Sequence, residues 1–162
     1  ASRADLPRRP DIEEIAMKKD VFIMIKGVQD IDGEKDTIEM LTKGKYYKKK
    51  GSWFIDYDEA EEEDAAPTIK TMLQVDGTDK VTMTRRGKRR SQLIIEAGAR
   101  HQCLYDNGFT DWIMGVQGGE IKNELKENGG MLHFRYSLDI NTALSSENEV
   151  SIVVKECEHH DA

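Results

Sequence analysis

Apolar and polar residues alternate at two-residue spacing along most of this chain. The clearest case is residues 131–141, where the even positions from Leu132 to Ile140 are apolar or aromatic and the odd positions from His133 onward are polar. A two-residue period puts successive side chains on opposite faces of a β-strand. The segment is therefore predicted to be a strand with one buried face.

The same pattern recurs between short turns. Residues 87–116 hold three alternating runs, 90–96, 100–106 and 110–116, separated by Ala97-Gly98-Ala99 and Asn107-Gly108. Glycine-centred turns between such runs are typical of β-hairpins, and Asp76-Gly77 is another such turn. Further strands are expected at residues 20–29, 37–49, 53–58, 69–75, 80–84 and 150–155.

Two regions interrupt this ladder. Gly118-Gly119 is expected to separate the strand before it from residues 120–127, which fit either a short helix or a strand. Residues 145–148 are expected to form a polar loop. About ten short strands without a crossover helix predict an all-β fold, an antiparallel up-and-down β-barrel, whose closure removes exposed sheet edges.

The domain organisation follows from this pattern. Residues 17–157 are predicted to form a single β-barrel domain, followed by a polar tail at residues 158–162. Residues 1–16 contain two of the three prolines, and Met17 resembles a natural start. We therefore expect residues 1–16 to be an extension that is either non-native or helical, with the helix over residues 11–16.

Composition narrows the function classes. The chain has 162 residues, a net charge of −7 and 34% charged residues, and it contains no apolar run long enough for a transmembrane helix. Its N-terminus lacks the apolar core of a signal peptide, so a cytoplasmic location is expected. Cys103 and Cys157 have no metal-ligand spacing. We predict no cofactor, metal or membrane partner, and the negative charge argues against nucleic acid as a default partner.

Five short segments resemble the YwiB-like family of small bacterial barrels. They are residues 17–22, 87–93, 100–103, 138–141 and 146–148, and the resemblance extends from Met17 to Cys157. It implies a bacterial protein with a calycin- or lipocalin-like barrel. The family has no known function, so the resemblance implies no catalytic residues.

One set of aromatic residues and a histidine could line the barrel interior. Small antiparallel barrels either fill that interior with side chains or enclose one small ligand, and aromatic rings with polar tips are typical of such a pocket. The leading hypothesis is a pocket for a small apolar or amphipathic ligand, and the alternative is an ordinary core. The candidate residues are Trp53, Tyr57, His101, Tyr105, Trp112 and Tyr136.

The sequence is also compatible with two other functions. His101 and Cys103 share a strand face, so an enzyme with a cysteine nucleophile is one alternative, although no third orienting residue is identified. The hairpin at residues 85–90 is almost wholly basic and could contact nucleic acid or an acidic protein. Counting strands puts it at the same barrel rim as the acidic loop 59–64, where opposite charges would neutralise each other. The sequence does not predict the oligomeric state.

Overall fold

The computed structural model describes residues 17–60, 66–88, 90–106 and 111–157, and all its regular structure is β-strand. No helix long and apolar enough to cross a membrane occurs in this part of the chain. The strands are β1 (Lys19–Ile31), β2 (Glu34–Lys49), β3 (Ser52–Glu59), β4 (Ile69–Asp76), β5 (Lys80–Gly87), β6 (Arg90–Glu96), β7 (Arg100–Asp106), β8 (Asp111–Lys126), β9 (Gly129–Ile140) and β10 (Ala143–Glu156).

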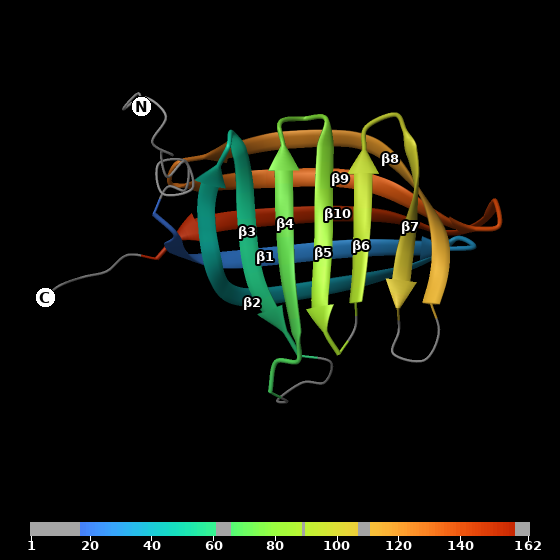
Figure 1. Cartoon of the computed structure of the whole chain (residues 1–162), viewed down its shortest axis with the longest axis horizontal. Helices are drawn as coiled ribbons and strands as arrows, with labels where there is room; N and C mark the ends of the chain where they lie inside the picture. Colours follow the sequence, from blue (N-terminus) through green and yellow to red (C-terminus); the bar gives the residue numbers. More distant parts are fainter. Residues whose placement is uncertain (1–16, 61–65, 89, 107–110, 158–162) are drawn as a thin grey trace, which may run out of the picture.

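Each strand pairs antiparallel with the next in sequence, and β1 closes the barrel on β10. In Figure 1, β3 to β6 cross β1, β9 and β10 at a steep angle, so the barrel has two halves whose strands run in different directions. The predicted all-β up-and-down barrel is confirmed. Among the described residues, β6 and β7 share the fewest ladder pairs of any two neighbouring strands, Arg90–Asp106 and Ser91–Tyr105.

Two predicted breaks in the ladder lie inside strands. Gly118-Gly119 does not end a strand but belongs to a bulge of β8, and residues 120–126 continue that strand rather than forming a helix. Residues 145–148 are likewise part of β10, whose pairing with β9 shifts between Leu144 and Ser146. A bulge adds a residue to one strand without ending the pairing, so a turn-like sequence can lie within a strand. The helix expected over residues 11–16 lies outside the described residues.

Inward-facing side chains pack one end of the barrel solid. Tyr46, Ile55 and Leu73 are fully buried in one continuous cluster. The Tyr46 ring stacks on Trp53, with 4.6 Å between ring centroids, and its hydroxyl donates to the Lys126 carbonyl at 2.7 Å. We call this end the floor. The opposite end, where β1 finishes at Ile31 and β3 finishes at Glu59, we call the mouth.

Candidate functional site: the barrel mouth

A polar row faces inward just above the floor. It follows from the strand register, because residues paired across an antiparallel ladder point to the same face of the sheet. On β3 the row lies two residues beyond the fully buried Ile55, and on β4 it lies two residues before the fully buried Leu73. Its members are Tyr57, Thr71, Arg85 and Ser91.

Glu59 joins this row to the rim of the mouth. Its Oε2 atom lies 3.2 Å from Arg85 Nε and also accepts a hydrogen bond from the Thr71 hydroxyl. The Arg85 and Glu59 side chains are both partly exposed, whereas Thr71 is almost fully buried. The ion pair therefore lies where solvent meets the barrel interior.

Two phenols complete the polar cluster. Tyr57 is buried on β3, and Tyr136 faces inward from β9 on the other half of the barrel. Burial raises the pKa of both hydroxyls above the usual value, and the positive charge of Arg85 partly offsets that rise. Both groups are therefore protonated at neutral pH and can donate a hydrogen bond. We call Tyr57, Glu59, Thr71, Arg85 and Tyr136 the mouth cluster.

The mouth also contains open space. Gly27 occupies an inward position on β1, two residues beyond Ile25 and between Ile38 and Val150 in the ladder. A Cβ atom added to Gly27 would meet no other atom within 4 Å. Ile38 faces the same way and is nevertheless 69% exposed, and Val150 and Tyr136 are only partly buried. Solvent therefore reaches inward-facing residues at the mouth, in contrast to the floor.

The structure brings only part of the predicted ligand set together. Tyr57 and Tyr136 meet in the mouth cluster, and Trp112 shares the ladder row but is 43% exposed. Trp53 and His101 lie toward the floor. Trp53 shares a face with Tyr57, but the two residues are four positions apart, which is about 13 Å along a strand. The Tyr105 backbone pairs with Ser91, and its side chain lies outside what is described.

His101 and Cys103 have separate partners. The His101 Nε2 atom lies 2.8 Å from Glu96 Oε1, and the Cys103 sulfur accepts a hydrogen bond from the Ile94 amide at 3.3 Å. Cys103 is buried at the β6–β7 seam. Its sulfur accepts the amide hydrogen bond that a backbone carbonyl of the neighbouring strand accepts in a regular sheet. No contact between imidazole and thiol is found among the described residues, so the geometry gives no support to a nucleophilic pair.

Arg85, which the sequence places in the basic hairpin 85–90, does not lie at an outward hairpin tip. It belongs to β5 and continues the inward alternation of Val81 and Met83, while Arg86 is exposed on the outer face. Glu59 likewise continues the alternation of Ile55 and Tyr57. The acidic and basic segments do meet at one rim, as expected, through the Arg85–Glu59 pair. The predicted strands 80–84 and 53–58 each stop one residue before these side chains. Extending each two-residue alternation by one position would have predicted that both side chains face inward.

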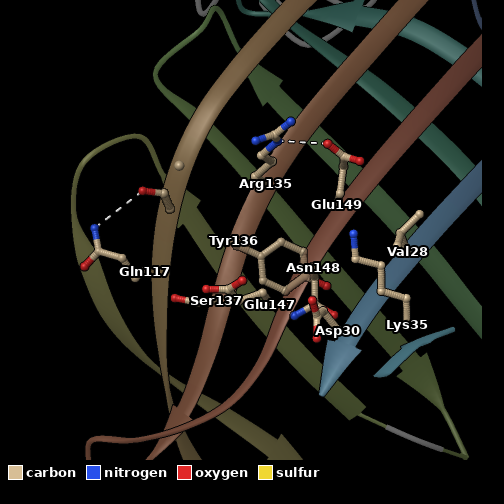
Figure 2. A pocket seen from close by; sticks show the side chains of 12 residues that line it. Val28, Asp30, Lys35, Gln117, Arg135, Tyr136, Ser137, Glu147, Asn148 and Glu149 are labelled. Carbon is tan, nitrogen blue, oxygen red and sulfur yellow. Dashed lines mark hydrogen bonds and ion pairs between the residues drawn. The ribbon is translucent and has the colours of Figure 1, made fainter. Parts of the chain in front are cut away.

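The outer surface has grooves of its own, all open to solvent. One groove of about 450 Å³ runs along β8, β9, β10 and β1 (Figure 2), and Tyr136 of the mouth cluster is among the residues that line it. Gly118 and Gly119 contribute no side chains to it, and Arg135 and Glu149 are already paired across it, with 2.8 Å between Nε and Oε2. Among the described residues no group of three acidic, histidine or cysteine side chains is suited to hold a metal.

Comparison with known proteins supports the fold and identifies a family. The crystal structure of ywiB protein from Bacillus subtilis matches with a TM-score of 0.77 and 22% identity, covering 91% of this chain and 98% of that chain. No curated protein matches. The family model described as a domain of unknown function, DUF1934, matches residues 23–152. With a match over most of its barrel, this chain belongs to the DUF1934 family, the YwiB-like family of small bacterial proteins of unknown function.

Proposed function

We propose that this protein binds a small amphipathic molecule in the mouth of its barrel. The observation that carries the proposal is the open space in front of Gly27, in the same barrel interior that the hydrogen-bonding groups of the mouth cluster face. Ligand sites in small barrels combine an apolar wall with a few polar groups that orient the ligand.

The chemistry of the ligand follows from the polar groups that face this interior. Arg85 and the phenols of Tyr57 and Tyr136 are donors, while the Glu59 oxygen facing them is engaged by Thr71 and Arg85. The polar end of the ligand therefore carries acceptor oxygens, as a carboxylate, carbonyl or hydroxyl does. Ile38 and Val150 on either side of Gly27 provide contacts for its apolar part.

Calorimetric titration with decanoate tests this function, because decanoate combines acceptor oxygens with an alkyl chain. We expect saturable binding to the full chain. Gly27→Leu fills the space and should weaken binding at least about tenfold, a loss of about 1.4 kcal/mol. The Gly27 backbone does not have a positive φ, so leucine fits without backbone strain.

Val28→Leu is the matched control, since it adds leucine one residue along the same strand but on the outer face. It should leave the affinity unchanged. Decanoate binding that Gly27→Leu and Val28→Leu affect equally would place the ligand outside the mouth. Absence of saturable binding by decanoate would remove the support for an amphipathic carboxylate ligand.

A further inference from the structure

Four outward-facing apolar side chains form one row across four adjacent strands. Met24 on β1 pairs with Leu41 on β2 and with Val153 on β10, and Val153 pairs with Met131 on β9. Their neighbours along each strand, such as Ile23 and Ile152, face the core and are buried. We call Leu41, Met24, Val153 and Met131 the apolar row.

The apolar row is exposed to solvent. Leu41 is 70% exposed, Met24 55% and Met131 51%, and Val153 is half-buried between them. Single exposed apolar residues are common on soluble proteins, but a contiguous patch across neighbouring strands marks an interaction surface. The row spans three strand spacings, about 14 Å.

The face that carries the row is large enough for a stable complex. Strands β2, β1, β10 and β9 lie side by side (Figure 1), and each has at least 12 residues. Four strands of that length cover about 40 Å by 19 Å, or roughly 750 Å². A standard specific interface buries about 800 Å² on each partner.

The residues beside the row are complementary under a two-fold rotation. On β2, Lys43 and Glu39 are the next outward positions on either side of Leu41. On β1, Phe22 and Lys26 flank Met24 in the same way. Consider a two-fold axis that runs along the row, between the two packed faces. It is perpendicular to the strands and reverses their direction in the second copy. It therefore sets Lys43 against Glu39 of a second copy and Phe22 against Lys26 of that copy.

The aromatic ring on this face already accepts a lysine cation. The Lys43 amine lies 5.4 Å from the centroid of the Phe22 ring, a distance typical of cation–π contacts. The proposed arrangement gives the same ring a second lysine from the partner and gives Lys43 a carboxylate. We propose that the protein forms a two-fold homodimer through the apolar row, with the outer faces of β2, β1, β10 and β9 packed together.

Sedimentation velocity from about 1 to 100 µM tests the dimer. The wild-type chain should sediment as a dimer at the upper concentrations, and Met24→Glu should shift it to the monomer because two carboxylates would meet in the apolar row. Ile113→Glu is the control, since Ile113 is an exposed apolar residue on β8, outside the row. It should leave the dimer intact. Circular dichroism and thermal melting check that each variant folds.

Charge exchange tests the orientation. Lys43→Glu should weaken the dimer at least about tenfold, and adding Glu39→Lys to it should restore association. A wild-type chain that remains monomeric at about 100 µM would overturn the proposal, as would a dimer that Met24→Glu leaves intact or that Ile113→Glu also disrupts. Failure of the double variant to restore association would overturn the two-fold arrangement. The result is independent of ligand binding in the mouth.

Discussion

Arg85 and Glu59 form an ion pair at the point where the barrel interior meets solvent, with 3.2 Å between Nε and Oε2. They come from β5 and β3, which are not adjacent, and Thr71 on the strand between them donates to the same carboxylate. The pair therefore fixes a cationic donor beside the two phenols of the mouth cluster.

Arg85→Met should weaken decanoate binding about tenfold, because it removes a charged donor from the mouth cluster. Stability should fall by less than about 1 kcal/mol, since the ion pair is partly exposed. Arg86→Met is the matched control, as Arg86 follows directly on the outer face. Calorimetric titration and urea denaturation measure the two effects. Equal loss of affinity in both variants would argue against a role for the inward arginine.

Tyr46→Phe should lower the free energy of unfolding by about 1 kcal/mol, because it removes the hydrogen bond to the Lys126 carbonyl but keeps the stacked ring. Tyr46→Ala also leaves a cavity and should cost about 3–5 kcal/mol. Urea denaturation measures both values. Decanoate affinity should be unchanged in Tyr46→Phe, since Tyr46 lies at the floor. A tenfold loss of affinity there would contradict the division between floor and mouth.

Asp56→Asn should stabilise the protein at pH 7 and have no effect at pH 3. Burial raises the pKa of Asp56, and the hydrogen bond from Tyr47 and the charge of Lys18 only partly offset this rise. Its Oδ1 atom is buried with no hydrogen-bond partner among the described residues. A carboxyl group whose pKa is higher in the folded than in the unfolded state lowers stability as the pH rises from the unfolded value through the folded one.

The gain at pH 7 should be up to about 1 kcal/mol, measured by urea denaturation at both pH values. Asp58→Asn provides the control, because Asp58 lies two residues further along the same outer face and is exposed. It should change stability little at either pH. If Asp56→Asn were destabilising at pH 7, the favourable interactions of the ionised carboxylate with Tyr47 and Lys18 would outweigh the cost of its burial.

Oligonucleotide binding, measured by fluorescence anisotropy, should be weak and lost at physiological salt. The net charge is −7, and Arg85 is already paired with Glu59, so fewer cations of the hairpin can bind phosphates. Arg86→Glu combined with Arg89→Glu should leave folding nearly unchanged. Tight, salt-resistant binding that this double substitution abolishes would instead support a nucleic-acid function for the hairpin 85–90.

Much of the fold could be predicted because the two-residue period persists wherever a strand has one buried face. The run at 69–75 became β4 with one further residue, and the run at 80–84 became β5 with three further residues. Gly118-Gly119 was misinterpreted because a bulge and a turn have the same local composition. Only pairing with β9 distinguishes them.

The candidate site was harder to predict, because it depends on register between strands. The sequence gives the face of Tyr57 relative to Trp53, but not their distances from the barrel ends. By composition, Arg85 falls in the basic hairpin 85–90 and Glu59 in the acidic loop 59–64. Their inward direction depends on where β5 and β3 finish, and the stabilising contact joins residues 26 positions apart.

Ligand binding in the barrel mouth is tested by native mass spectrometry of the chain after incubation with a small-molecule extract of bacterial cells. The wild-type chain and Val28→Leu should each retain one small molecule, and Gly27→Leu should retain none. Decanoate in excess should displace the retained molecule. Ligand binding in the barrel mouth would be contradicted if the wild-type chain showed only the mass of the protein. It would also be contradicted if Gly27→Leu retained the molecule as well as the wild type does.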